Sequence, residues 1–328
     1  MKSSNYLNAL VLILSFGFFS CGEKNNDPIV TPDPTPVPVV PAPEVQKPAG
    51  NDYLSRLEVP KTKDGNIFIY HCTKEGNDSV MTYCLEFDPK KYHSRWVAFS
   101  FDALTIQQNT KRPETDPFAD DPSLPAKCQV ESGGFGSTYT DLNGQKQTFR
   151  MDRGHLCASA DRLYSVTANE QTFYMSNMSP QLNSFNQDYW IIFEQFVQDY
   201  PRTQQGGKNV LKSTVEALYV TKGGTIADDQ ILGFVNRWNG ASIAVPKYYF
   251  MALLCKMNTG SYKAIGFLME HKEYGYLPNK KTDKEEIKKS VVTIDELESA
   301  TGIDFFHNLP DDIESKVEAT CDPALWNL

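Results

Sequence analysis

The sequence lacks both a long apolar run and an excess of positive charge. The apolar run near its start, from Ala9 to about Phe19, covers only about 11 residues, fewer than the roughly 20 that a membrane-spanning helix needs. The chain of 328 residues has a formal net charge of −9, which argues against a general electrostatic attachment to nucleic acid, because such proteins normally present a basic face. A small, locally basic site on an acidic body remains compatible with this composition.

The cysteines lack the spacings that are typical of metal and redox sites. The seven cysteines include no CxxC pair, and no His/Cys spacing resembles a zinc site. Six cysteines remain when Cys21 is set aside: Cys72, Cys84, Cys128, Cys157, Cys255 and Cys321. An even number in an exported protein suggests disulfides, although the sequence does not choose among the pairings and some thiols could be free and buried.

The first 50 residues predict export and a spacer rather than a folded unit. Residues 1–20 combine a lysine near the start with a short apolar core, which predicts a signal peptide. Cys21 follows at once, as in a bacterial lipobox, although residues 18–20 are bulkier than usual, and we expect this cysteine to be lipidated. A soluble secreted protein and a signal-anchor helix are the alternatives. Residues 21–50 are rich in proline, which favours a semi-rigid spacer with a reach of roughly 70 Å.

This layout predicts a location in the cell envelope. We expect a lipid-anchored protein at the outer membrane or the cell surface, with a periplasmic or secreted protein as the alternative. The lipid anchor is the only membrane contact that the sequence predicts.

Residues 51–328 predict one domain of the α+β class. Segments rich in β-branched and aromatic residues predict strands at residues 66–71, 79–87, 95–101, 215–223, 247–255 and 263–271. Residues 184–200 predict a helix capped by Ser184, and residues 292–306 predict a helix with a capping box of Thr293 and Glu296 and a stop at Gly302. Because strands and helices do not alternate strictly, the α+β class is favoured.

The segment "DRGH" (residues 152–155) carries three polar groups that suit neither a buried strand nor a helix interior. His155 is a candidate general base, because imidazole titrates near neutral pH. Gly154 permits unusual backbone angles or close approach of a substrate, and Arg153 offers a planar donor fork suited to phosphate or carboxylate. An ordinary turn with a satisfied histidine explains the four residues equally well when they are taken alone.

A second polar group lies within residues 172–194. Asn186, Trp190 and Glu194 are spaced i, i+4, i+8, which places them along one face of the expected helix. The amide oxygen of Asn186 is a hard ligand suited to Mg²⁺, and Glu194 could hold one of the waters of that ion. Asn177 and Gln181 precede the helix, and either could instead satisfy backbone groups in a loop.

Taken together, these residues resemble the DNA/RNA non-specific endonucleases of the ββα-metal type. The matching positions, in the family's order and spacing, are Asp152-Arg153-Gly154-His155-Leu156, Ala158, Ala160, Thr172-Phe173, Ser176-Asn177, Pro180-Gln181, Asn186-Gln187, Trp190 and Glu194. Looser similarity extends from about Leu54 to Trp326. The resemblance implies a mixed, mainly antiparallel sheet core flanked by helices.

The resemblance also implies a catalytic centre. His155 would activate water for attack on a phosphodiester, and Asn186 would be the one direct protein ligand of Mg²⁺, with Mn²⁺ as the alternative ion. Glu194 would hold one of the water ligands of the metal. DNA and RNA are therefore the expected partners, and no protein partner is predicted.

Further residues would support this centre. Arg153 and an upstream arginine, for which Arg112 is the candidate, would stabilise the transition state. Asn177, Gln181 and Asp152 would bind substrate or support the site, with Asn177 expected to make the more direct contact. The charges between residues 146 and 162 are mainly positive, so we expect a locally basic site.

Cys157 departs from the family pattern, in which alanine is more common. It could form a disulfide with Cys128, or it could be a reactive thiol beside His155 in a Cys–His hydrolase. The second interpretation is disfavoured, because side chains at i and i+2 on a strand are too far apart for a direct hydrogen bond. Within the resemblance, Cys255 and Cys321 are a further candidate disulfide.

The leading hypothesis is an exported, Mg²⁺-dependent nuclease that cuts DNA and RNA without preference for the sugar. The alternative is a catalytically inactive surface lipoprotein that keeps the fold and binds nucleic acid. The joint presence of His155, Asn186 and Glu194 argues against the alternative, because a protein that only binds does not need that set.

Overall fold

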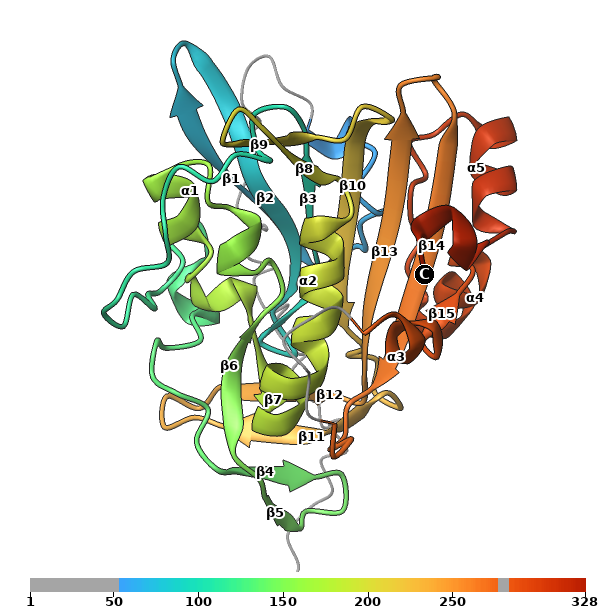
Figure 1. Ribbon diagram of the computed structural model, residues 1–328. Helices are drawn as coiled ribbons and strands as arrows, with labels where there is room; N and C mark the ends of the chain where they lie inside the picture. The colour runs from blue at the N-terminus through green and yellow to red at the C-terminus, as the bar shows by residue number, and fades with distance from the viewer. Residues whose placement is uncertain (1–52, 277–282) are drawn as a thin grey trace, which may run out of the picture. The chain divides into compact units, whose positions relative to one another are not determined.

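The computed structural model describes residues 53–276 and 283–328 (Figure 1). The expected signal peptide, the expected lipidation site at Cys21 and the spacer over residues 21–50 lie outside the described residues, so they stay predictions. Within the described ranges, no helix is both long enough and apolar enough to cross a membrane.

An antiparallel sheet of seven strands forms the centre of the domain (Figure 1). Its strands are β1 (Ile67–Glu75), β2 (Asp78–Asp88), β3 (His93–Phe101), β10 (Val215–Gly224), β13 (Tyr248–Met257), β14 (Tyr262–Glu270) and β15 (Val291–Val292), in the order β1-β2-β3-β10-β13-β14-β15. Each neighbouring pair is antiparallel. All six strands predicted from the sequence are confirmed, and all of them lie in this sheet.

Both faces of this sheet are covered, which explains the long apolar stretches of its central strands, such as β13. Successive residues of β3 alternate between two apolar clusters: Val97 and Phe99 belong to the first, and Trp96 and Ala98 belong to the second. Residues of α2 (Ile191–Asp199) pack into the first cluster, and residues of α4 (Ile294–Thr301) and α5 (Asp311–Glu318) pack into the second. The α+β class is confirmed.

Helix α4 has the ends that its sequence predicts. The Thr293 hydroxyl accepts a hydrogen bond from the Glu296 backbone nitrogen at 3.1 Å, and the Glu296 carboxylate accepts one from the Thr293 backbone nitrogen at 2.8 Å. Gly302 follows the last turn with a φ of 64°, a left-handed conformation that glycine adopts at little cost.

The helix predicted over residues 184–200 differs at its start. It begins as a π-helix over Phe185–Trp190 and continues as α2. Ser184 does not cap it, because its own φ and ψ of −66° and −34° are helical, whereas an N-cap residue adopts an extended conformation. Its hydroxyl instead donates a hydrogen bond to Glu273 at 3.2 Å. Wide π turns of this kind are frequent at functional sites.

Residues 152–155, which the sequence makes a poor buried strand, do form a strand, but one that is only partly buried. Strand β6 (Met151–His155) pairs with β7 (Met178–Leu182) in a separate two-stranded sheet. With a single partner strand, β6 is not enclosed like the strands of the main sheet, and this leaves room for the polar side chains of Asp152 and Arg153.

Shorter elements, which the sequence did not predict, complete the domain. They are strands β4 (Thr138–Asp141), β5 (Lys146–Thr148), β11 (Ile231–Asn236) and β12 (Ser242–Pro246) in one small sheet, the hairpin of β8 (Arg202–Gln205) and β9 (Lys208–Leu211), helices α1 (Val166–Gln171) and α3 (Lys284–Lys288), and single 3₁₀ turns at Tyr53–Ser55, Ala126–Cys128, Ser159–Asp161, Met175–Asn177 and Pro323–Trp326.

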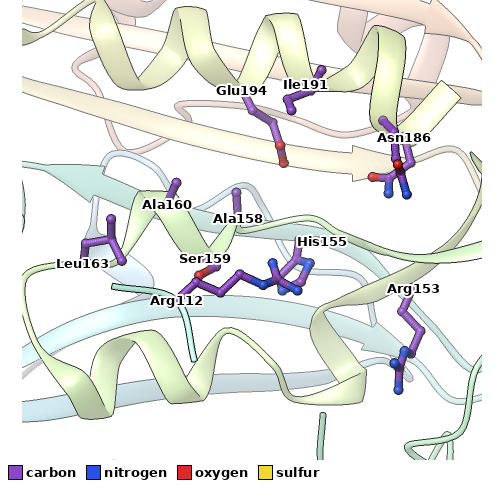
Figure 2. A pocket seen from close by; sticks show the side chains of 11 residues that line it. Arg112, Arg153, His155, Ala158, Ser159, Ala160, Leu163, Asn186, Ile191 and Glu194 are labelled. Atoms are coloured by element: carbon purple, nitrogen blue, oxygen red, sulfur yellow. The ribbon is translucent and has the colours of Figure 1, made fainter. Parts of the chain in front are cut away.

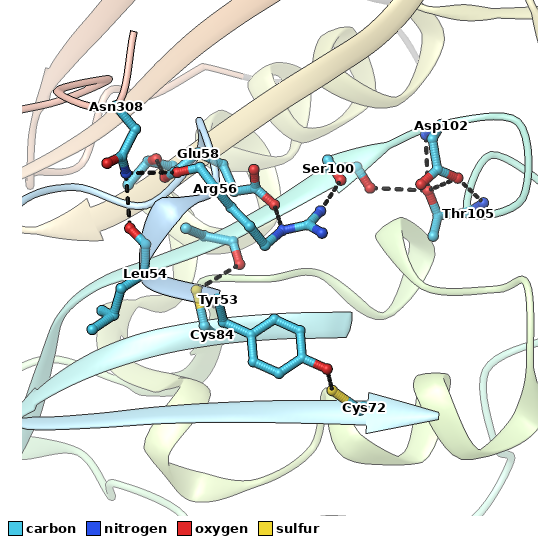
Figure 3. Close-up of polar contacts among 12 residues, drawn as sticks. Tyr53, Leu54, Arg56, Glu58, Cys72, Cys84, Ser100, Asp102, Thr105 and Asn308 are labelled. Carbon is cyan, nitrogen blue, oxygen red and sulfur yellow. Dashed lines mark hydrogen bonds and ion pairs between the residues drawn. The ribbon is translucent and has the colours of Figure 1, made fainter. Parts of the chain in front are cut away.

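The first described residues are held on the domain by side-chain contacts (Figure 3). Arg56 donates from Nε to Glu58 at 2.6 Å and from Nη2 to the hydroxyl of Ser100 at 3.0 Å. Asn308 donates to the backbone carbonyls of Leu54 and Arg56 at 2.8 and 3.0 Å. The folded domain therefore includes the chain from Leu54 onward.

The expected disulfides are wrong. The six cysteines of the described residues are all free thiols, including the two expected pairs Cys128/Cys157 and Cys255/Cys321. Cys128, Cys157 and Cys255 are buried in the first apolar cluster. Cysteine in such a place behaves as a small apolar residue, and a core of this size does not need covalent links.

We expect acid to destabilise the domain through two buried histidines. His271 Nε2 accepts a hydrogen bond from the Leu182 backbone nitrogen at 2.8 Å, and Nδ1 lies 2.8 Å from the Pro246 carbonyl oxygen, so this ring is held in its neutral form. Burial lowers the pKa of His271 to about 4, and it lowers the pKa of His93 to about 4 as well.

The unfolded chain takes up protons at these histidines below a pH of about 6.5, whereas the folded chain does so only near pH 4. Stability is therefore full above about pH 6.5 and falls on the way to pH 4, by an amount on the order of 3 kcal/mol per histidine. Urea unfolding from about pH 7 to pH 4.5 measures this loss, and a His271→Gln variant should show a smaller pH dependence. An unchanged free energy of unfolding across that range would contradict the prediction.

Candidate active site

A pocket of about 480 Å³ brings together the residues that the sequence singled out (Figure 2). It lies between the π-helix and α2 on one side and the segment that follows β6 on the other. Five of the candidate residues line it: Arg112, Arg153, His155, Asn186 and Glu194. Three further candidates, Asp152, Asn177 and Gln181, lie behind its wall.

His155, the last residue of β6, packs against two aromatic rings that also contact each other. Its ring centroid is 5.7 Å from that of Phe118 and 5.0 Å from that of Phe173. The side chain is buried, and Nε2 has no hydrogen-bond partner within the described part of the chain. Burial, together with the positive charges of Arg112 and Arg153, lowers the pKa of His155 to about 3. The imidazole is therefore neutral at physiological pH and free to accept a proton.

Arg153 is held in place by its neighbours. Its guanidinium lies 3.6 Å from the ring centroid of Phe118, and it donates hydrogen bonds to the Ser132 carbonyl at 2.7 Å and to Asp116 at 2.9 Å. Asp116 neutralises part of its charge. This partner could not be predicted from the sequence, because Asp116 and Arg153 are far apart along the chain.

Arg112 reaches the same pocket over the ring of Phe173. Its guanidinium lies 4.7 Å from the ring centroid of Phe173, and it makes no hydrogen bond within the described residues. Of the two arginines, Arg112 is thus the one whose donors are available to an anion. The expected basic character of residues 146–162 is only partly present, since Arg162 is fully buried against Phe99.

Asn186 is oriented by Asp152. The Asn186 amide nitrogen donates to an Asp152 carboxylate oxygen at 3.0 Å, and the amide nitrogens of Asn183 and Gln187 donate to the same oxygen, each at 2.9 Å. A carboxylate only accepts hydrogen bonds, so the nitrogen of Asn186 must face Asp152 and its oxygen must face away. The oxygen is therefore left for a ligand in the pocket.

Glu194 lies two turns further along and points into the same pocket (Figure 2). Trp190 Nε1 donates to Glu194 Oε1 at 3.0 Å, which fixes the carboxylate. Burial raises the pKa of Glu194 to about 7, and the positive charge of Lys222 opposes this shift. An amide oxygen and a carboxylate facing one pocket suit a hard divalent cation that keeps several waters, so the residues present fit a metal of this type.

Asn177 supports the backbone and does not line the pocket. Its Oδ1 accepts a hydrogen bond from the Cys157 backbone nitrogen at 2.8 Å, and its Nδ2 donates to the carbonyls of Cys157 and Thr172 at 2.8 and 2.7 Å. This is the backbone role that the sequence left open, rather than the more direct contact expected of Asn177.

Gln181 explains the glycine of the motif. A Cβ atom at Gly154 would lie 2.0 Å from Gln181 Oε1, so any larger residue would collide with this side chain. The glycine is thus required by the packing of β6 against β7, and not by a substrate or a positive φ.

Comparisons with known proteins agree with this geometry. A model of the DNA/RNA non-specific endonuclease family matches residues 63–312. The chain belongs to this family. As a member, it is an endonuclease that depends on a divalent metal.

Three relatives show how far the similarity extends. Nuclease C1 of Cunninghamella echinulata var. echinulata is 27% identical over 232 residues, which cover 70% of this chain and 81% of that protein. The mitochondrial endonuclease G of Homo sapiens is 28% identical over 229 residues, covering 70% and 68%. A nuclease of Nostoc sp. is 27% identical over 241 residues, covering 73% and 76%.

A solved structure shares the fold. The EndoG/EndoGI complex, described as showing the mechanism of EndoG inhibition, aligns with a TM-score of 0.52 at 20% identity and covers 75% of this chain and 89% of that chain. At this identity the likeness shows the fold alone.

Cys157 has no place in the chemistry of this endonuclease. It is fully buried, and burial raises the pKa of its thiol far above the usual range. It does not line the pocket. A protonated, inaccessible thiol is not a nucleophile, so the Cys–His hydrolase interpretation is wrong.

A buried ion pair, which the sequence did not predict, lies behind the pocket wall. Lys222 Nζ lies 2.8 Å from Asp161 Oδ2, and both side chains are fully buried. Asp161 also accepts hydrogen bonds from the Ala158 backbone nitrogen and from Gln198, each at 2.9 Å. The pair thereby fixes the short segment that forms one wall. A lysine inside an otherwise apolar strand was the available signal for it.

Replacing Asp152 with asparagine is expected to weaken metal binding while leaving the fold intact. Asparagine offers one acceptor oxygen instead of two, so the Asn186 amide loses the partner that fixes its orientation. We expect the Mg²⁺ concentration for half-maximal cleavage to rise about 10- to 100-fold, the usual effect of removing a group that orients a metal ligand. Cleavage rates measured over a range of Mg²⁺ concentrations test this, with Asp188→Asn as the control. An unchanged Mg²⁺ dependence would contradict the role of Asp152.

Proposed function

We propose that this protein is an exported, Mg²⁺-dependent endonuclease that hydrolyses both DNA and RNA, with Mn²⁺ as an alternative metal. One observation carries the proposal: the pocket sets the neutral imidazole of His155 opposite Asn186 and Glu194, with Arg112 and Arg153 on its wall. Each of these groups suits one part of phosphodiester hydrolysis.

His155 acts as the general base. Its lowered pKa keeps the ring unprotonated, and the side chain lines the pocket. The ring takes a proton from water as the water attacks the phosphorus. The rings of Phe118 and Phe173 pack against the imidazole and limit its movement during this transfer.

The arginines bind the phosphate. Arg112, whose donors are available, contacts a non-bridging oxygen of the phosphate. This interaction becomes stronger as negative charge builds up on that oxygen. Arg153 adds positive charge and, through its contact with Phe118, keeps one wall of the histidine site in place.

Asn186 is the direct ligand of the metal, and Glu194 holds one of its waters. When bound, the ion supplies charge neutralisation for the phosphate and for the leaving 3′ oxygen. Because these contacts all address phosphate, the enzyme accepts either sugar and shows little sequence preference, and its affinity falls with salt.

Cleavage of supercoiled plasmid and of single-stranded RNA by residues 51–328 tests the proposal. We expect both substrates to be cut to fragments with 5′ phosphates in the presence of Mg²⁺, and neither to be cut in the presence of a chelator. Binding of both substrates without cleavage in any divalent metal would instead support the inactive nucleic-acid-binding protein.

The location requires a separate test. We propose that Cys21 is lipidated after removal of residues 1–20 and that the spacer holds the nuclease away from the envelope. A Cys21→Ser variant expressed in a bacterial host should incorporate no labelled palmitate and should leave the membrane fraction. Retention of the variant in the membrane fraction would contradict the anchor.

A further inference from the structure

Three carboxylates meet on the opposite face of the main sheet from α2. Asp295 and Glu298 lie on α4, and Glu318 is the last residue of α5. One carboxylate oxygen from each residue lies within 4.8 Å of the others. Both helices pack into the second apolar cluster, whereas the active-site pocket adjoins α2 in the first, so the two sites are separate.

The strongest indication that this cluster binds a ligand comes from Glu318. Its side chain is 6% exposed, it points into the cluster, and its Oε1 has no hydrogen-bond partner within the described residues. A buried carboxylate oxygen without a partner is costly. Its position at the C-terminal end of α5 adds to that cost, because this end of a helix carries partial negative charge.

Within the described part of the chain, no cation is among the strongest electrostatic neighbours of Glu318. Its strongest electrostatic neighbours are all carboxylates, namely Glu298, Glu314, Asp295 and Asp304. The nearby cation Lys61 lies 3.5 Å from Asp304 at the exposed rim, where both side chains are open to solvent. The Glu298 carboxylate is itself fixed, because its Oε1 accepts a hydrogen bond from the Phe305 backbone nitrogen at 2.6 Å.

We propose that Asp295, Glu298 and Glu318 bind a divalent cation, Ca²⁺, which ties α4 to α5. Ca²⁺ takes oxygen ligands at about 2.3–2.6 Å, so two oxygens on one ion lie up to roughly 5 Å apart. The three carboxylate oxygens lie within 4.8 Å of one another, which is inside this limit. Asp295 is exposed, which leaves room for water to complete the coordination.

This cation is structural, and it is distinct from the metal of the nuclease centre. By bridging the first turn of α4 and the last turn of α5, it neutralises Glu318 and holds both helices on β14. An exported protein meets Ca²⁺ at concentrations that a site with few protein ligands can use.

Calcium binding to an Asn186→Ala variant of the chain without its expected signal peptide and lipidated cysteine, residues 22–328, tests the proposal without interference from the active site. We expect calorimetry to show one bound Ca²⁺ per chain. At a Ca²⁺ concentration about 100 times Kd, the Tm should rise by about 5 °C relative to chelator. Adding Glu318→Gln should abolish both effects, whereas the matched change Glu285→Gln, at an exposed glutamate on α3, should leave both unchanged.

Two further results keep the test decisive. In chelator, Glu318→Gln should be at least as stable as the parent, because burial and neighbouring carboxylates disfavour the charged form of Glu318 and raise its pKa to about 8. When Ca²⁺ is added, the parent should become the more stable of the two. If Glu318→Gln fails to fold, Asp295→Asn, at an exposed position, should still weaken Ca²⁺ binding about tenfold. Absence of bound Ca²⁺ at millimolar concentrations, binding that survives these changes, or a Tm that responds to protons but not to Ca²⁺ would overturn the proposal.

Discussion

Replacement of His155 by alanine is expected to slow plasmid cleavage by at least about a hundredfold, within the ~10²–10⁴ range of a lost general base. The imidazole lines the pocket, is kept neutral by burial and by Arg112 and Arg153, and has an Nε2 atom that the fold does not use. Its removal therefore takes away the proton acceptor without breaking a described hydrogen bond.

Initial rates of plasmid nicking at saturating Mg²⁺ measure this effect. Unfolding by urea should show that the variant remains folded. His307→Ala is the matched control, because His307 lies in the C-terminal part of the chain and does not line the pocket. A rate for His155→Ala within tenfold of the parent would remove His155 from the role of base.

Replacement of Lys222 by methionine is expected to destabilise the domain by about 3–5 kcal/mol. Lys222 and Asp161 are fully buried and 2.8 Å apart, so the change leaves an unpaired charge in the core. The segment held by Asp161 through the Ala158 backbone nitrogen forms a wall of the pocket, and cleavage should also fall.

A double variant separates charge from packing. Lys222→Met with Asp161→Asn removes both charges, and it should recover much of the stability lost in the single variant. Urea unfolding of the parent, the two single variants and the double variant gives the coupling between the two residues. Additive losses in the double variant, or a loss below 1 kcal/mol for Lys222→Met, would contradict the importance of the pair.

The main sheet could be predicted from the sequence because its strands are long and apolar. The central strands are buried on both faces, so each appears as a nearly continuous apolar run such as that at residues 248–255, and the run needs no tertiary information. The capping box at Thr293 and Glu296 is equally local. Strand β6 could not be found in this way, because its polar residues follow from a single partner strand and an adjoining pocket.

The composition of the site could be predicted, but its support could not. The motif placed His155, Asn186 and Glu194 in the right order, and the structure brings them into one pocket. The contacts that orient them, such as that of Asp152 with Asn186 or of Lys222 with Asp161, join residues more than thirty positions apart. The spacing of residues along the sequence does not indicate such pairs. The prediction of disulfides was wrong. The even number of cysteines suggested disulfides, whereas the cysteines of the described residues are free thiols.

Plasmid cleavage as a function of Mg²⁺ concentration, compared between the parent and Asn186→Ala, tests the central claim most directly. The account predicts that the parent is inactive in chelator and active in Mg²⁺, and that Asn186→Ala has lost at least about a hundredfold in rate or needs far more Mg²⁺, as expected for a direct metal ligand. Cleavage by the parent in chelator, or the same Mg²⁺ dependence in both proteins, would contradict a metal-dependent nuclease centre in this pocket.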